Sequence, residues 1–274
     1  MKEQHIDYKV VPYSKIRRLM AAEFRLSHHM PMIHGLIEVD VTRARTHLRE
    51  QKAKTGEALS FTAFLIACLA QAVEEHKAVQ AFRQGRKHLI VFEDVDVLTY
   101  VDRGKAPMPY MIRAANHKTV RQIHQEIRDA QVQDVAKAAV GFKLVQSLPT
   151  FLFKPFMRIV GRDPQLLKQF VGTVALSAVG MFGNGAGWGI PPASPPSLCI
   201  TVGGIGEKPG VVDGKIAIRD YLSLTISFDH DIIDGAPAAR FTARLKELIE
   251  SGYGLSDSVA DLEQAGAETA AKKG

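Results

Sequence analysis

The stretch from Tyr221 to Gly235 constrains the fold of this chain more than any other. It reads YLSLTISFDHDIIDG and alternates apolar and polar residues up to Asp229. Side chains alternate between the two faces of a strand, so we predict a strand over residues 221–230 with one apolar face. His230 continues the apolar set in this alternation, which predicts an imidazole that points toward the packed side where the strand stops.

The residues around this histidine suggest a site. A general base needs an environment that is partly desolvated yet reachable, and the end of a strand provides one. Asp234 lies in the turn before the next helix, where it would cap that helix or pair with a buried cation. Gly235 would permit a backbone conformation that a side chain blocks. A single histidine at the end of an apolar face is more often a satisfied core residue, so the pattern alone does not establish catalysis.

The rest of the chain mixes helical and strand patterns without strict alternation, which predicts an α/β domain built on a mixed sheet. Ser60 stands where a helix N-cap is expected, and Asp213-Gly214 is typical of a two-residue hairpin turn. A turn is predicted over residues 102–109. The predicted helices cover residues 13–29, 60–76, 119–135 and 237–250, and the predicted strands cover 33–41, 88–101, 171–178, 197–205, 221–230 and a hairpin at 211–219.

The composition indicates which kind of partner and which cellular compartment to expect. The 35 Lys and Arg against 29 Asp and Glu are spread along the chain, which suits a small phosphate-bearing ligand and gives no reason to expect a nucleic-acid partner. Cys68 and Cys199 lie in apolar runs, so buried thiols in a reducing compartment are expected. His28, His29 and His34 lack a fourth ligand, so no metal site is predicted. Without a signal peptide or a membrane-spanning run, a cytoplasmic location is predicted.

Residues 142–170 form an unusual segment that is apolar, basic and interrupted by prolines. Short helices packed on the surface are expected here. An interfacial membrane contact is considered but not favoured, because Pro149 and Pro155 prevent one long amphipathic helix.

A family resemblance strengthens the interpretation of the histidine. HDIIDG, from His230 to Gly235, matches the HxxxDG motif of the 2-oxoacid dehydrogenase acyltransferases, which share their fold with chloramphenicol acetyltransferase. The stretches VPYSKIRRLMA, EVDVT, SFTAFLIACLAQAVEEH and GTVALSAVGMFG resemble further segments of that family in order. The resemblance covers about residues 8–250. It implies a chloramphenicol acetyltransferase-like two-layer sandwich, a mixed sheet with packed helices, with a catalytic domain over residues 1–256 and a frayed tail over 257–274.

The resemblance also implies a chemistry and an assembly. The family moves an acyl group between coenzyme A and the thiol of a dihydrolipoyl arm. His230 matches the family's general base, and Ser177 matches the serine that donates to the oxyanion. Asp234 matches an aspartate that pairs with an arginine near the N-terminus, here Arg17, and Gly235 completes the turn. The family's site lies between neighbouring subunits of a trimer, so His230 and Ser177 are expected to meet across a subunit interface, with acyl-CoA as substrate and no metal.

Departures from the family pattern leave alternatives open. The chain starts at the core, without a lipoyl domain, so a lipoyl group would come from a separate protein. Asp231 stands where the family usually has arginine, and Ala178 follows Ser177 where asparagine or serine is common. These changes allow a freestanding acyltransferase with another acceptor, or a non-catalytic trimeric scaffold or CoA-binding module. Residues 142–170 resemble an insertion, which would form a lid or a pocket for a bulky acyl chain.

Overall fold

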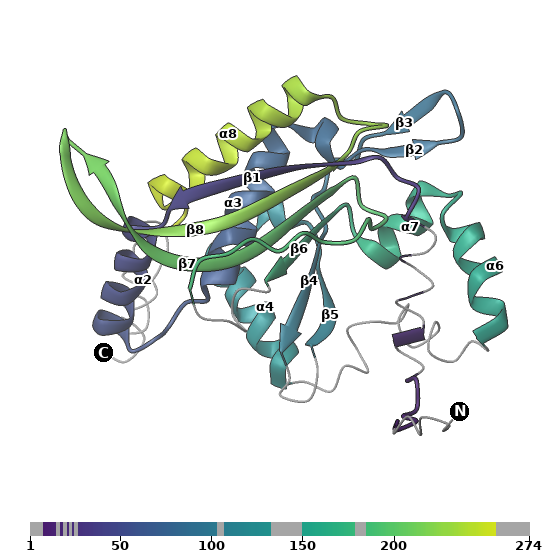
Figure 1. The fold of residues 1–274 in the computed structure, drawn as a ribbon, viewed down its shortest axis with the longest axis horizontal. Coiled ribbons are helices and arrows are strands. Elements are labelled where there is room, and N and C mark those ends of the chain that lie inside the picture. The colour runs from purple at the N-terminus through teal and green to yellow at the C-terminus, as the bar shows by residue number, and fades with distance from the viewer. Residues whose placement is uncertain are drawn as a thin grey trace, which may run out of the picture.

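A computed structural model of the chain describes residues 8–14, 17–18, 21, 24, 27–102, 107–132, 150–178 and 185–255. Six of its strands form one sheet in the order β1-β8-β7-β6-β4-β5 (Figure 1). The pairs β4–β6 and β6–β7 are parallel and the other three are antiparallel, so the predicted mixed sheet is confirmed. The sheet strands are β1 (Met32–Asp40), β4 (Val97–Asp102), β5 (Pro107–Ile112), β6 (Val174–Ala178), β7 (Leu198–Val212) and β8 (Lys215–Asp229), and β2 (Phe82–Gln84) and β3 (His88–Ile90) form a separate hairpin.

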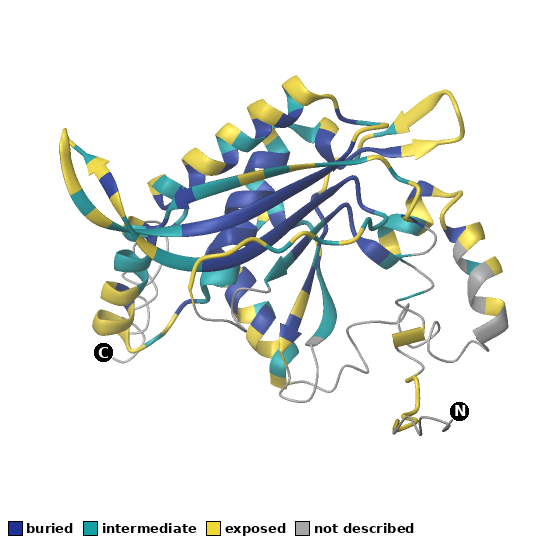
Figure 2. Ribbon diagram, in the orientation of Figure 1, coloured by how far each residue is buried: buried dark blue, intermediate teal, exposed yellow. Residues whose placement is uncertain are grey.

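The longest strands, β7 and β8, form one continuous hairpin. Its turn is Asp213-Gly214, where both residues have positive φ angles, 50° and 74°, as the predicted hairpin turn requires. The sequence had predicted shorter, separate strands here, and this was wrong, because β7 keeps its pairing with β8 through Pro209 and Gly210. The outer half of the hairpin projects beyond the helices, and its tip is largely exposed (Figure 2).

Capping residues mark the ends of several helices, including the predicted N-cap Ser60. The Ser60 hydroxyl accepts a hydrogen bond from the Ala63 N–H at 3.3 Å at the start of α3, and Gly252 ends α8 with a φ of 74°. Thr119 and Gln122 exchange hydrogen bonds at the start of α4. The helices of the described residues are α2 (Thr42–Thr55), α3 (Phe61–Glu75), α4 (Val120–Val132), α6 (Thr150–Val160), α7 (Pro164–Val171) and α8 (Gly235–Ser251), with short 3-10 turns η1 (Lys77–Gln80) and η2 (Ala115–His117).

The core lies between the sheet and the helices α3 and α8, which cover one of its faces (Figure 1). Alternate residues of the central strands point into this layer, as the strand period requires. Burial of these side chains supplies most of the driving force for folding. The residues where α3, α8 and the sheet meet include Leu65, Leu69, Leu176, Ile200, Leu224 and Leu245.

On the opposite face, residues 185–196 cross the central strands as an irregular loop. Trp188 Nε1 donates to the Ile37 carbonyl at 3.1 Å, which ties the loop to β1. The crossing needs a glycine at Gly203, because a Cβ there would lie 2.0 Å from the Gly187 carbonyl oxygen. Figure 2 shows the resulting band of buried residues along β7 and β8.

Several elements differ from expectation or lie outside the described residues. α2 was not predicted, and β5 replaces part of the turn expected at 102–109. α6 and α7 confirm short helices in the segment 142–170, although α6 contains Pro155 in its interior. The first predicted helix is described only in part, and residues 142–149 and 257–274 lie outside the description. None of the helices in the described part of the chain is long and apolar enough to span a bilayer.

Candidate active site

His230 lies in the first turn position after β8. The Asp229 carboxylate accepts a hydrogen bond from the Asp231 N–H at 3.0 Å, and the Asp229 carbonyl accepts one from the Ile233 N–H at 2.9 Å. The His230 N–H donates to the Pro31 carbonyl at 2.9 Å. These bonds turn the chain before the strand alternation reaches His230, whose side chain is 44% exposed. The prediction that the imidazole points into the packed side was therefore wrong.

Asp234 faces the histidine. Its Oδ1 lies 3.7 Å from His230 Nδ1, and the carboxylate is 87% exposed. Asp234 occupies the N-cap position of α8, as expected, but its side chain makes no capping hydrogen bond, and among the described residues its ion-pair partner is the exposed His230. A carboxylate on the Nδ1 side favours the tautomer that leaves Nε2 as the proton acceptor.

Gly235 does not play the role that the sequence suggested. A Cβ at this position would meet nothing within 4 Å, and the backbone is not in the left-handed region. The reason is that the chain enters α8 directly, with ordinary helical geometry, once Asp234 has turned it. The expectation that Gly235 is required for the backbone conformation is wrong within one chain.

Sequence reasoning missed the partner of Asp231. Arg83 of β2 places its Nη1 3.0 Å from Asp231 Oδ2. The neighbouring Asp229 is buried, and this burial raises the pKa of its carboxyl group. No local pattern could have linked Arg83 to Asp231, since 148 positions separate them.

Ser177 lies on the same sheet as His230 but far from it. In β6, Ser177 pairs with Thr201 of β7, which pairs with Thr225 of β8. Thr225 precedes His230 along β8, so at about 3.4 Å per residue and about 4.8 Å between strands the two site residues lie roughly 20 Å apart. A single chain therefore does not bring the predicted base and the predicted oxyanion donor together.

Arg17 is exposed, and its N–H lies 3.3 Å from the Ser14 hydroxyl that caps the predicted first helix. No ion pair joins Arg17 to Asp234 among the residues that the structure describes. Figure 1 shows the described pieces of the first helix well away from the start of α8. The structure does not form the predicted Arg17–Asp234 pair within one chain, since the two segments lie apart and the Asp234 carboxylate lies beside His230.

The two cysteines are free and buried, as predicted. Burial raises the pKa of the Cys68 thiol, and it raises the pKa of Cys199 to about 11. Neither thiol is a nucleophile near neutral pH, because the thiolate is the reactive form. His34 Nδ1 lies 2.8 Å from the Ser227 hydroxyl, and within the described ranges no three His, Cys, Asp or Glu side chains form a metal-binding group.

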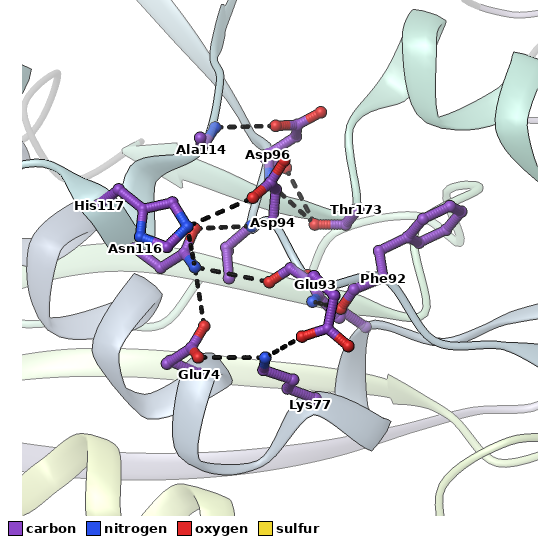
Figure 3. A network of polar contacts seen from close by, with 12 residues as sticks. Glu74, Lys77, Phe92, Glu93, Asp94, Asp96, Ala114, Asn116, His117 and Thr173 are labelled. Atoms are coloured by element: carbon purple, nitrogen blue, oxygen red, sulfur yellow. Dashed lines mark hydrogen bonds and ion pairs between the residues drawn. The ribbon is translucent and has the colours of Figure 1, made fainter.

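A buried carboxylate ties the segment around α7 to the sheet. Asp96, just before β4, accepts the Ala114 N–H at 2.9 Å and the Arg113 guanidinium at 2.7 Å. Its own N–H donates to the Thr173 hydroxyl at 3.0 Å, and Figure 3 shows Asp96 between Ala114 and Thr173. Arg113 also donates to two carbonyls in the last turn of α7. This cluster fixes α7 at the end of the sheet where β2 and β3 lie (Figure 1).

The fold and the HxxxDG turn define a class: an α/β domain with the architecture of acyltransferase cores. A probable dihydrolipoamide acetyltransferase from Listeria monocytogenes superposes with a TM-score of 0.69 at 23% identity, over 89% of this chain and 95% of that one. The cubic core of a pyruvate dehydrogenase multienzyme complex superposes with a TM-score of 0.70 at 22% identity, over 92% and 95%. These likenesses confirm the predicted fold class.

Sequence comparison identifies the family. The model of the 2-oxoacid dehydrogenases acyltransferase catalytic domain matches residues 5–139 and 167–255. The chain belongs to this family. A lipoamide acyltransferase component of the branched-chain alpha-keto acid dehydrogenase complex from Bacillus subtilis is 28% identical over 249 residues, which is 89% of this chain and 52% of the relative. The chain thus spans about half the length of the curated relatives that it matches.

Proposed function

We propose that the chain is the catalytic core of an acyltransferase that moves an acyl group between coenzyme A and a thiol acceptor of the dihydrolipoyl type. The observation that carries the proposal is the HxxxDG turn, in which His230 stands exposed at the end of β8 with its Nδ1 facing Asp234. Membership of the acyltransferase family supports the same reaction class.

The chemistry needs one base and one oxyanion donor. His230 Nε2 takes the proton of the acceptor thiol as its sulfur attacks the thioester carbonyl of acyl-CoA. The carbonyl oxygen becomes an oxyanion in the tetrahedral intermediate, to which the Ser177 hydroxyl donates. The intermediate collapses as the bond to the CoA sulfur breaks, and the His230 imidazolium returns its proton to the departing thiolate. Asp234 stabilises that imidazolium across 3.7 Å.

The separation of Ser177 from His230 supports a site shared between subunits. Because one chain keeps them roughly 20 Å apart at the spacing of paired strands, a complete site needs Ser177 of one copy beside His230 of the next. We propose a homotrimer, or an assembly of trimers, as the active form. The projecting end of the β7–β8 hairpin supports assembly, since its exposed apolar residues Val211, Ile216 and Ile218 are 76–81% exposed in the single chain.

The domain extent and the acceptor are part of the proposal. We assign residues 1–256 to the catalytic domain and treat 142–170 as an insertion, which is supported by the family model leaving residues 140–166 unmatched. The acceptor is a lipoyl group, and acyl-CoA is the donor. A cytoplasmic setting is supported by the free thiols of Cys68 and Cys199.

Release of CoA tests the proposal. The purified protein is incubated with acetyl-CoA and free dihydrolipoamide, and CoA release is followed for the wild type and for His230→Ala. We expect release that depends on His230. Binding of CoA without turnover over a panel of thiols would overturn the proposal in favour of a trimeric CoA-binding scaffold. Equal release by His230→Ala would remove the histidine from the mechanism.

A further inference from the structure

We propose that Arg83 is a positioning residue for the reaction: through its ion pair with Asp231 it fixes the turn that carries His230. This inference rests on the proposed function and adds a residue to it. Arg83 touches neither reacting group, so its effect is transmitted through Asp231, the residue directly after the base.

The ion pair acts together with a chain of hydrogen bonds that also joins the segment carrying β2 to the His230 turn. The first connection is a chain of two hydrogen bonds through Ser197, whose hydroxyl donates to the Val79 carbonyl at 2.9 Å and whose carbonyl accepts the Asp229 N–H at 2.9 Å. The second is the pair of Arg83 with Asp231 at 3.0 Å. The hydrogen bonds hold Asp229, before His230, and the ion pair holds Asp231, after it. The turn is therefore restrained on both sides, whereas one connection alone would leave the other side free to move.

The strand that carries Arg83 is held in place by packing and hydrogen bonds. Its neighbour Phe82 is buried and packs edge to face against Phe92, with ring centroids 5.6 Å apart. Gln80 donates to the Phe92 carbonyl at 2.7 Å. On the outer side, Lys168 of α7 lies 5.0 Å over the Phe92 ring. Helix α7 thereby supports the strand that holds Arg83.

Charge explains why an arginine is needed here. Asp229, Asp231 and Asp234 place three carboxyl groups around His230, and Arg83 is the cation that pairs with the middle one. His29 also acts electrostatically on Asp229 from the chain before β1. Without Arg83, the Asp231 carboxylate loses its ion-pair partner among the described residues, and the restraint on that side of the turn is lost.

The pair contributes to placement more than to stability. Both side chains are about half exposed, 53% for Arg83 and 45% for Asp231, and exposed ion pairs contribute only about 0–1 kcal/mol to folding. A displacement of a catalytic group by about 1 Å, by contrast, lowers a rate by up to about a hundredfold. The variants should therefore fold normally and turn over slowly.

A charge-swap series tests the inference. The variants are Arg83→Gln, Asp231→Asn, the double neutral variant and the swap Arg83→Asp with Asp231→Arg, with Arg86→Gln in the exposed turn between β2 and β3 as the matched control. We expect kcat to fall about tenfold in each single variant with KM for acetyl-CoA unchanged, and the double neutral variant to fall no further. The swap should regain most of the rate.

Either of two kinetic outcomes overturns the inference: a kcat within twofold of wild type in Arg83→Gln, or a double neutral variant in which the two single losses multiply. An NMR measurement distinguishes failure of the positioning role from failure of the proposed function. The ring signals of His230 in ¹³C-histidine-labelled protein should move in Arg83→Gln and stay in place in Arg86→Gln, whether or not any thiol is acylated. Unmoved signals in both variants would overturn the positioning role.

Discussion

His124 offers a test of the packing between α3 and α4, because its neutral imidazole accepts a backbone hydrogen bond at the start of α3. The side chain is buried, and its Nδ1 accepts the backbone N–H of Ser60, the N-cap of α3, at 3.0 Å. Burial lowers the pKa of His124, and the positive charges of Arg128 and Arg121 lower it further. Only the neutral imidazole can accept this bond.

The sign and size of the pH effect follow from proton linkage. Because the pKa is lower in the folded state, the unfolded chain binds more protons below its ordinary pKa of about 6.5. The stability contributed by His124 is present above that pH and is lost as the pH falls toward the folded pKa. For one proton, the loss between pH 7.5 and 5.5 is at most about 1.4 kcal/mol.

Guanidinium unfolding at the two pH values, at one fixed protein concentration, measures this loss. In His124→Asn the amide oxygen can accept the Ser60 N–H at every pH, so the variant should lack the contribution. We expect the wild type to lose up to about 1.4 kcal/mol more than the variant on acidification. Equal losses in the two proteins would refute the reasoning, since the other histidines are common to both.

The remaining predictions concern buried polar groups. The Thr225 hydroxyl is buried and has no hydrogen-bond partner among the described residues, so Thr225→Val should leave the free energy of unfolding unchanged or raise it by about 1 kcal/mol. Ser227→Ala removes the hydrogen-bond partner of His34 and should lower the free energy of unfolding by about 1 kcal/mol. Thermal melts of the two variants compare these effects, and a loss of stability in Thr225→Val would contradict the first expectation. Arg113→Met removes the guanidinium from the buried Asp96 carboxylate, which keeps Lys168 Nζ at 3.6 Å, and should cost about 2 kcal/mol by chemical denaturation; a loss under about 0.5 kcal/mol would contradict this.

Local signals predicted the parts of the fold that depend on them. Ser60 marked the start of a helix, and Asp213-Gly214 marked the hairpin turn, because each acts through its own backbone neighbourhood. The three long amphipathic or buried helices α3, α4 and α8 followed from apolar spacing, since each buries one continuous set of side chains.

The missed elements carried no such signal. α2 is a mostly polar helix in which only Ala44 and Gln51 are buried, so it presents no apolar stripe. β5 contains Pro107 and Pro109 and lies at the edge of the sheet, where strands tolerate prolines because one side needs no ladder hydrogen bonds. Both elements are defined by their contacts with parts of the chain that are distant in sequence.

For the candidate site, too, the sequence predicted some residues, while other features depend on the folded chain. The HxxxDG motif singled out His230 and Asp234, but the direction of the imidazole depends on the hydrogen bonds of Asp229, which the strand alternation does not contain. The partner of Asp231 is Arg83, and only the folded chain brings them together. The distance between Ser177 and His230 likewise follows from strand register and not from either motif.

The central claim is that Ser177 and His230 of different subunits form one site, and subunit mixing tests it most directly. His230→Ala and Ser177→Ala are each purified, confirmed inactive, mixed in equal amounts under conditions of subunit exchange and assayed for CoA release from acetyl-CoA in the presence of dihydrolipoamide. Random mixing pairs an intact Ser177 with an intact His230 at about one quarter of the interfaces, so about a quarter of the wild-type activity should return. If exchange is demonstrated and the mixture stays inactive, both residues act within one chain and the claim is wrong.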